Sequence, residues 1–254
     1  MKDFLISIIT VSFNSEETIS QTIESVLNQT DTNIEYIIVD GGSTDKTFKI
    51  INSYKNDFSL KGINYKFISE PDTGIYNAFN KGLKMATGNW VSFLGSDDFY
   101  VLNAIETYNK AFSKNVDLIY SNVDVINQKK TIKKINGIWS WKIFKRYMNI
   151  AHVGAFHNID FFKKYGFFDE SYKIAGDYEL LLRAKGNLRT FKIEKTTAKM
   201  LDGGASNSNV IKVLKETKRA KINTGNASII LCYFDFIVAL VKFYLKKNVY
   251  AVIR

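Results

Sequence analysis

The 254-residue chain has little cysteine, proline or glycine, and each shortage excludes some classes of protein. Cys232 is the only cysteine, so no internal disulfide can form, which agrees with a reducing compartment. Pro71 is the only proline, and we find no Pro-rich linker, low-complexity segment or internal repeat. No small-residue cleavage site follows the apolar N-terminal stretch, so we expect a cytoplasmic protein.

Two nucleotide-binding motifs are also missing. The chain contains neither G-x-G-x-x-G nor G-x-x-x-x-G-K-[ST], which argues against a dinucleotide dehydrogenase and against a P-loop NTPase. At 46% hydrophobic residues, the chain can nevertheless bury a sizeable core, so intrinsic disorder is excluded.

Positive charge is present, but it is unevenly distributed. Residues 1–184 carry 21 Lys and Arg against 21 Asp and Glu, whereas residues 185–254 carry 14 against 4. The whole net charge of +10 therefore lies in the last 70 residues. A neutral body with a basic tail predicts contact with an anionic surface, while a solvated lysine-rich face is the simpler alternative.

The first half of the chain alternates strand and helix patterns. Short β-branched and aromatic segments predict strands at residues 4–11, 34–40, 63–69, 89–95 and 116–122. Helical spacing predicts helices at residues 14–29, 44–54, 73–86 and 101–112, the first with Asn14 as N-cap and Glu17 in a capping box. This alternation predicts an α/β fold with a doubly wound, mainly parallel sheet.

Ligands of open α/β sheets bind beyond the carboxyl ends of the strands, so the residues that follow each strand matter most. Here they read "TVSFN", "DGGSTD", "SEPDTG" and "GSDD". Asp97 and Asp98 directly follow a buried strand, where two like charges repel unless a cation offsets them. Oxygen ligands without a His/Cys cluster favour Mg²⁺ or Mn²⁺ over zinc, and such an ion implies a phosphate ester as ligand.

These segments together resemble the successive signatures of glycosyltransferase family 2. The resemblance is carried in order by "SIITVSFNSEETISQTIESVLNQ", "YIIVDGGSTDKT", "EPDTGIYNAFNKGLKMATGNWVSFLGSDD" and "GFFDESYKIAGDYELLLR", which cover about residues 4–185. It implies an inverting sugar transferase of the bacterial surface-glycan type with the A-type, Rossmann-like nucleotide-sugar fold.

The resemblance also implies roles for individual residues. Thr10, Ser12 and Asn14 would form the wall around the nucleotide base, and Asp40 would accept the base N–H. A second segment, together with Ser96, would border the ribose and diphosphate of the nucleotide sugar: Asp72, Gly74, Asn77, Asn80 and Lys81.

The same resemblance implies the metal ligands and the catalytic base. "GSDD" is similar to the D-x-D motif of the family, with Gly95 in place of the first aspartate, so Asp97 and Asp98 would hold the metal. His152 would help to hold the metal or the leaving group. Asp177 in "IAGDYELLLR" would be the base that takes the acceptor proton, with Glu179 a weaker candidate.

The C-terminal segment, residues 211–254, is predicted to be a helical appendage to a nucleotide-sugar domain at residues 1–210. Its apolar stretch is interrupted by Ser228, Asp235 and Lys242, which lie seven residues apart and so form one stripe of a helix. Central charges disfavour a spanning helix. We expect a peripheral helix on an anionic membrane surface, held also by Lys246 and Lys247, with packing on the domain as the alternative.

Three functions remain open from the sequence. The leading one is an inverting, metal-assisted transfer from a nucleotide-diphosphate sugar, expected to be a UDP-sugar, to a lipid-linked or surface-glycan acceptor, with no nucleic acid as partner. A sugar-1-phosphate nucleotidyltransferase would share the sheet and the metal chemistry, but would need a basic loop where "SFNSEET" is acidic. The third candidate, a non-catalytic basic module that binds nucleotide or membrane, would not explain the aspartates.

Overall fold

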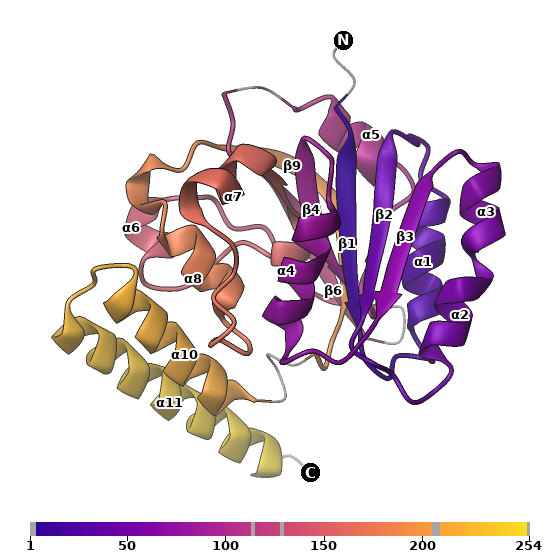
Figure 1. Ribbon diagram of the computed structural model, residues 1–254. Coiled ribbons are helices and arrows are strands. Elements are labelled where there is room, and N and C mark those ends of the chain that lie inside the picture. The colour runs from indigo at the N-terminus through magenta and orange to yellow at the C-terminus, as the bar shows by residue number, and fades with distance from the viewer. Residues whose placement is uncertain (1–3, 113–114, 128–129, 205–208, 253–254) are drawn as a thin grey trace.

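The computed structural model describes residues 4–112, 115–127, 130–204 and 209–252, with the backbone alone described for residues 246–252. Its centre is a nine-stranded sheet in the order β3-β2-β1-β4-β8-β6-β9-β5, with β7 paired to β6 (Figure 1). The strands are β1 (Ile6–Ser12), β2 (Ile34–Asp40), β3 (Asn64–Ser69), β4 (Trp90–Gly95), β5 (Phe99–Tyr100), β6 (Leu118–Asn127), β7 (Lys130–Ile135), β8 (Ala155–Asn158) and β9 (Thr190–Leu201).

Helices cover both faces of this sheet. They are α1 (Ile19–Leu27), α2 (Thr47–Ser53), α3 (Lys55–Leu60), α4 (Ile75–Met85), α5 (Ala104–Asn109), α6 (Trp141–Phe144), α7 (Ile159–Tyr165), α8 (Gly176–Leu182), α10 (Val210–Asn223) and α11 (Ile229–Val252), with 3₁₀ turns η1 (His152–Gly154) and η2 (Lys185–Asn187). All five predicted strands and all four predicted helices are present, and the α/β class is confirmed.

The sheet divides into a parallel part and a mixed part. Strands β3, β2, β1 and β4 run parallel, and their carboxyl ends point to the lower edge in Figure 1. Beyond β4, strand β8 is antiparallel to both β4 and β6, whereas β6 and β9 are parallel. The prediction of a mainly parallel sheet therefore describes the first four strands, which is the part that the strand-end residues come from.

Successive side chains of a strand point to opposite faces of the sheet, so a hydrophobic core forms on each face. Ile9 and Val11 of β1 face α4, α7 and α8, while Ile6 and Ile8 face α1, α2 and α5. Because helices cover both faces, every residue of β1 is buried, as expected for a central parallel strand.

The predicted start of the first helix is wrong. Helix α1 begins at Ile19, and its N-cap is Thr18. Asn14 has a left-handed φ of 48°, and its Oδ1 accepts a hydrogen bond from the backbone N–H of Thr44 at 2.9 Å. The side chain that was expected to cap its own helix therefore ties the loop after β1 to the loop after β2.

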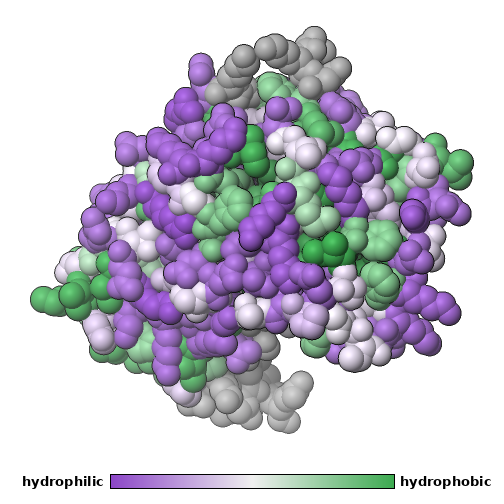
Figure 2. Space-filling model, viewed as in Figure 1, coloured by the Kyte–Doolittle hydropathy of each residue, from purple (hydrophilic) through white to green (hydrophobic). Residues whose placement is uncertain are grey.

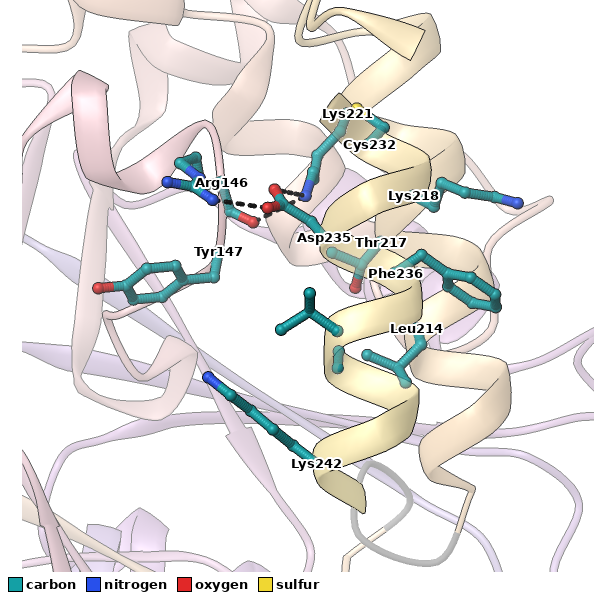
Figure 3. Close-up of a pocket in the computed structure, with 12 residues that line it drawn as sticks. Arg146, Tyr147, Leu214, Thr217, Lys218, Lys221, Cys232, Asp235, Phe236 and Lys242 are labelled. Atoms are coloured by element: carbon teal, nitrogen blue, oxygen red, sulfur yellow. Dashed lines mark hydrogen bonds and ion pairs between the residues drawn. The ribbon is translucent and has the colours of Figure 1, made fainter. Parts of the chain in front are cut away.

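The C-terminal helices form an antiparallel pair beside α8, at the lower left of Figure 1. Asp235 of α11 pairs with Lys221 of α10 at 2.9 Å and with Arg146 at 2.6 Å (Figure 3). Asp235 and Lys242 both line a groove of about 350 Å³, so this part of the polar stripe faces the rest of the protein. The side chains of Lys246 and Lys247, expected to contact the membrane, lie outside the described ones.

The opposite face of α11 is apolar and exposed. Figure 2 shows hydrophobic residues at the left end and lower edge of the molecule, where α11 runs in Figure 1. The large apolar side chains exposed on α11 are Ile229, Ile230, Leu231, Tyr233, Phe234, Ile237, Val241, Tyr244 and Leu245. We call these nine residues the outer face of α11. In the described residues, no helix is long and apolar enough to cross a membrane.

Candidate active site

The parallel register brings the predicted strand-end residues into one row. Ser12 of β1 lies beside Asp40 of β2, Asp40 lies beside Ser69 of β3, and Gly95 of β4 lies beside Val11 of β1. The loops that follow these strands therefore meet at one edge of the sheet, as the sequence predicts.

Asp40 is the hub of this row and is completely buried. Its carboxylate accepts hydrogen bonds from the hydroxyl of Ser12 at 3.1 Å, the hydroxyl of Ser69 at 2.6 Å and the backbone N–H of Ser43 at 2.9 Å. These bonds fasten the ends of three strands. The hydroxyl of Ser43 also donates to Oδ1, so each oxygen of the carboxylate accepts from two protein donors. Because a carboxylate oxygen has two lone pairs, a contact from Asp40 to a nucleotide base requires one of these hydroxyl groups to turn away, and that contact stays a prediction.

The other residues expected around the base are placed differently from one another. Thr10 is completely buried, and its hydroxyl accepts a hydrogen bond from Tyr36 at 3.0 Å, so it supports the sheet from inside. Asn14 is exposed at the edge. Between them, the ring of Phe13 is 61% exposed, and one of its edge atoms lies 3.5 Å from the position of a Cβ at Gly41. Phe13 is the flat apolar surface at this edge that the sequence interpretation missed.

The segment after β3 approaches the loop after β2 closely. A Cβ at Gly41 would lie 2.5 Å from Oδ2 of Asp72, so any other residue there would displace the Asp72 carboxylate. The other carboxylate oxygen of Asp72 accepts the backbone N–H of Gly74 at 2.7 Å, and Gly74 has a φ of 131°. Asp72 and Gly74 thus lie beside the strand-end row, where the sequence expects them.

Asn77, Asn80 and Lys81 are engaged with the protein itself. The amides of Asn77 and Asn80 donate to the carboxylate of Glu170 at 2.9 and 2.8 Å. Lys81 donates to the carbonyl of Pro71 at 2.9 Å and pairs with Glu70 at 2.8 Å. In this structure the three side chains fix the loops at residues 70–72 and 168–170, so any contact with ribose or diphosphate stays a prediction.

Asp97 and Asp98 converge at the end of β4. A Cβ at Gly95 would lie 2.9 Å from Oδ2 of Asp98 and 3.0 Å from Oδ1 of Asp97, so both carboxylates fill the space that a side chain at residue 95 would take. Burial and the neighbouring Asp97 raise the pKa of Asp98 to about 8, and burial raises the pKa of Asp97. Among the described residues, no lysine or arginine pairs with either carboxylate.

This carboxylate pair fits a hard divalent cation. Its oxygens are the ligands that Mg²⁺ and Mn²⁺ prefer, and a cation would offset both the burial of the two carboxylates and the repulsion between them. Beside it lies a polar cavity of about 400 Å³, lined by Ser96 and Asp97 on one side and by Asn14 and residues 15–18 on the other. Ser15 and Ser96 touch there through their hydroxyl groups, 2.8 Å apart.

His152 is not gathered with the carboxylate pair. In the part of the chain that the structure describes, no three His, Cys, Asp or Glu residues form a group that could hold a metal. The ring of His152 stacks on Phe93, with centroids 5.0 Å apart, and burial lowers its pKa while the charge of Asp177 partly offsets this. His152 is therefore a neutral imidazole near Asp177, and its Nε2 has no hydrogen-bond partner among the described residues.

Asp177 lies at the first turn of α8, beside the first turn of α4. The hydroxyl of Tyr76 donates to the carbonyl of Ile174 at 2.6 Å, accepts the backbone N–H of Asp177 at 3.3 Å and lies 3.4 Å from its Oδ1. A Cβ at Gly176 would come within 2.7 Å of the Tyr76 ring, so the glycine permits this contact. Because α4 starts just after β3, Tyr76 brings Asp177 to the strand-end edge.

Glu179, the weaker candidate for the base, is engaged with other residues of the protein. It is buried, pairs with Arg183 and accepts a hydrogen bond from the hydroxyl of Thr224 at 2.9 Å. These contacts tie α8 to the end of α10 and leave Asp177 as the first-turn carboxylate without an ionic partner among the described residues.

Two further residues escaped the sequence interpretation because their partners are distant in the chain. Tyr76 contacts Asp177 across 101 positions, and Glu216 of α10 binds the segment just before Asp177 across about 40 positions. In the sequence, Tyr76 is an apolar position of a helix, and Glu216 is one charge among many on α10. Local patterns contain no signal for either contact.

Known proteins with similar sequences belong to one family. Residues 7–169 match the model of Glycosyl transferase family 2. The UDP-Glc:alpha-D-GlcNAc-diphosphoundecaprenol beta-1,3-glucosyltransferase WfgD of Escherichia coli is 36% identical over 136 residues, which cover 53% of this chain and 51% of WfgD. A PGL/p-HBAD biosynthesis glycosyltransferase of Mycobacterium bovis is 29% identical over 192 residues, which cover 72% of this chain and 70% of the relative. The match with WfgD thus spans about half of that enzyme.

Solved structures share the fold. TarS of S. aureus in complex with UDP-GlcNAc superposes with a TM-score of 0.69 at 19% identity, covering 92% of this chain and 71% of TarS. The mannosyltransferase PcManGT from Pyrobaculum calidifontis, in complex with GDP-Man and Mn²⁺, gives a TM-score of 0.65 at 13% identity, covering 96% of this chain and 75% of that one. These similarities confirm the A-type glycosyltransferase fold. Because one family model matches well over half of the chain, and named relatives are glycosyltransferases, the chain belongs to glycosyl transferase family 2 and is a glycosyltransferase that uses nucleotide sugars.

Proposed function

We propose that this glycosyltransferase moves a sugar from a UDP-sugar to a lipid-linked acceptor, with inversion at the anomeric carbon. The observation that carries the proposal is the meeting of two sites at one edge of the sheet. One is the carboxylate pair Asp97 and Asp98, and the other is Asp177, held beside α4 by Tyr76. A cation site and a general base at the same edge are the two groups that such a transfer requires.

The donor is proposed to lie over the strand-end row. The exposed ring of Phe13 is suited to stack on the nucleotide base, since aromatic rings bind bases through their flat faces. Ser12, Asp72 and Gly74 border the same position. Uracil as the base is supported by the name of the E. coli relative, a UDP-glucose enzyme, while the donor sugar itself is not specified by these contacts.

The metal is proposed to be Mn²⁺ or Mg²⁺ bound by Asp97 and Asp98. When bound, such an ion neutralises the charge that develops on the leaving diphosphate. With two protein carboxylates, the remaining ligands would be phosphate oxygens and water, which is the usual pattern for Mg²⁺. His152, neutral and close to Asp177, is proposed to donate a hydrogen bond near the diphosphate rather than to bind the metal.

Asp177 is proposed to be the general base. The acceptor hydroxyl oxygen forms a bond to the anomeric carbon while the bond from that carbon to the diphosphate oxygen breaks, and the hydroxyl proton passes to a carboxylate oxygen of Asp177. The backbone N–H of Tyr178 donates to Oδ1 of Asp177 at 2.8 Å, and the Tyr76 hydroxyl lies 3.4 Å from the same oxygen. Both contacts hold the carboxylate in place at the first turn of α8.

The acceptor is proposed to be presented by a membrane. The outer face of α11 exposes nine large apolar side chains, whereas its polar stripe is turned toward Arg146 and Lys221. A helix with this division lies in the membrane surface, and basic residues near it add about 1 kcal/mol each on anionic lipid. We therefore propose a peripheral position on the cytoplasmic face of the membrane. The E. coli relative, whose name includes a diphosphoundecaprenol acceptor, supports a lipid-linked substrate.

A panel of nucleotide sugars tests the proposal. Thermal unfolding is followed with each UDP-, GDP-, CMP- and dTDP-sugar, in Mn²⁺ or in EDTA, and hydrolysis or transfer is measured for each. We expect stabilisation by UDP-sugars only when the metal is present, and loss of this effect in Asp97→Ala. Asp160→Ala, which removes an exposed carboxylate paired with Lys163, is the matched control and should behave as the wild type. Equal UDP affinity with and without metal would contradict the metal site.

A further inference from the structure

Glu216 of α10 makes an unusual set of contacts for a residue outside the nucleotide domain. Its carboxylate accepts hydrogen bonds from three consecutive backbone N–H groups, those of Lys173 at 3.1 Å, Ile174 at 2.8 Å and Ala175 at 3.0 Å. Glu216 is 9% exposed, so these bonds are made largely out of water. Charge-assisted bonds of this kind are about twice as strong as neutral ones.

These three N–H groups belong to the segment that leads directly into α8. Ala175 is the N-cap of α8, and Asp177 follows two residues later. The N–H of the N-cap has no partner within the helix, and Glu216 binds it together with the N–H groups of the two residues before it. Glu216 thereby sets the position and direction of the first turn that carries Asp177.

Neighbouring contacts hold the same segment from both sides. The guanidinium of Arg219, one turn beyond Glu216 on α10, stacks on the ring of Tyr172 at 3.7 Å. Lys173 donates through Nζ to the carbonyl of Thr73 at 2.6 Å, next to Asp72 and Gly74. The segment 172–175 is therefore held between α10 and the loop that borders the proposed donor site.

We propose that Glu216 is a positioning residue for catalysis: it fixes the 173–175 backbone so that Asp177 is aimed at the acceptor hydroxyl. This inference rests on the proposed role of Asp177 and assigns a catalytic purpose to α10, which the sequence places in the C-terminal appendage. Both oxygens of the Glu216 carboxylate are used by the 173–175 backbone, so in this proposal it acts through Asp177.

Glu35 provides a matched control. It is also a buried carboxylate that accepts two consecutive backbone N–H groups, those of Thr87 and Gly88, and it also receives the hydroxyl of Ser7. Unlike Glu216, it also pairs with a lysine, Lys66, at 2.8 Å. It lies five residues before Asp40 on β2, which puts it about 17 Å along the strand from the strand-end row. Glu35→Gln therefore gives an upper bound on what losing such a carboxylate costs in stability, at a site far from the base.

The test combines Glu216→Gln and Glu216→Ala with Asp177→Asn. Glu216→Gln keeps one acceptor oxygen. In otherwise wild-type protein we expect it to lower kcat by roughly 10-fold, which is a part of the ~10²-fold that a general base supplies. The KM for the donor and the UDP affinity should stay within about 2-fold of the wild-type values. Glu216→Ala should lower kcat further. In the Asp177→Asn background, Glu216→Gln should have no additional effect, because the group that it positions is gone.

Four outcomes decide between the proposals. A wild-type kcat in folded Glu216→Gln overturns the positioning role, and so does an equal fall in kcat in both backgrounds. A fall in kcat for Glu35→Gln as large as for Glu216→Gln, at matched thermal stability, also overturns it. If Asp177→Asn transfers sugar at the wild-type rate while Glu216→Gln is slow, then the base assignment fails separately, and Glu216 does not act through Asp177.

Discussion

Strand β1 and helix α11 are both strongly apolar in sequence, yet the fold treats them in opposite ways. Every residue of β1 is buried, because helices cover both faces of the parallel sheet. Helix α11 has a covered side that carries Cys232 and Asp235, and its apolar residues lie mostly on the outside. Hydrophobicity alone therefore does not predict burial. The strand is used for folding, and the helix retains an exposed apolar face, which the proposed membrane contact would cover.

The largest effect that tests this contrast is on stability. Ile38→Ala removes a completely buried side chain of β2 and should lower the free energy of unfolding by about 2–5 kcal/mol. Ile237→Ala makes the same chemical change on the outer face of α11, where the side chain is 57% exposed, and should cost at most about 0.5 kcal/mol. Urea unfolding of both variants measures the difference. A large cost for Ile237→Ala would show that α11 is packed in solution and not free for a membrane.

The next effect concerns the membrane itself. Phe234→Glu, Ile237→Glu and Val241→Glu together place three charges on the outer face of α11. They should weaken binding to phosphatidylglycerol vesicles, measured by sedimentation, by ~10²-fold or more, since full burial of an apolar side chain contributes about 1.5–3 kcal/mol and about half of each of these is already buried. Binding of the wild type should fall only partly at high salt, because salt screens charge but not apolar burial.

Its control uses exposed apolar residues on the catalytic domain. Leu60→Glu and Leu102→Glu change side chains that are 86% and 63% exposed, and they should leave vesicle binding unchanged. If these control variants reduce binding as much as the α11 variants do, the outer face is not the membrane contact.

A smaller effect is expected at the sheet edge. Phe13→Ala should weaken UDP binding about 10-fold, since stacking of a base on an aromatic ring contributes ~1–3 kcal/mol. Phe13→Tyr keeps the flat ring and should bind UDP as the wild type does. Isothermal titration with UDP and Mn²⁺ measures both, and unchanged affinity in Phe13→Ala would remove the ring from the donor site.

The smallest expected effect is on the pH dependence of the free energy of unfolding. Burial lowers the pKa of His157 well below the ordinary 6.5, so the folded protein keeps this imidazole neutral while the unfolded chain takes up a proton. The contribution of His157 to stability is therefore fully present above pH 6.5 and is lost as the pH falls, by at most about 1.4 kcal/mol per pH unit.

His157→Phe should remove this part of the pH dependence, because His157 lies among Phe93, Phe161 and Phe162. The measurement is urea unfolding of both proteins in EDTA between pH 5 and 8. Parallel pH profiles for the two proteins would contradict the assignment of the acid sensitivity to His157.

The sequence predicted the parallel part of the fold well because its signals are local. Strands such as residues 34–40 alternate with helices of clear spacing, and their ends carry Asp40 and Asp97. The mixed part of the sheet depends on pairings such as β6 with β9, which join residues about 70 positions apart and leave no local pattern.

For the site, the sequence predicted which loops meet but not which protein groups each side chain binds. Thr10, Asn77 and Asn80 fit the predicted motifs, yet the structure uses them to support the sheet or fasten loops. The direction in which such a side chain points depends on partners that are distant in the sequence, here Tyr36 for Thr10 and Glu170 for the two asparagines. Glu216 could not be predicted for the same reason, since its acceptor role appears only when α10 packs on α8.

The proton transfer proposed for Asp177 is tested most directly by comparing Asp177→Asn with the wild type at saturating UDP-sugar and Mn²⁺, with UDP affinity measured on the same samples. Loss of the base should lower the rate of sugar transfer by ~10²-fold or more, while UDP affinity stays within a few-fold, because Asp177 acts on the acceptor and not on the nucleotide. A variant that transfers sugar at the wild-type rate would contradict the account.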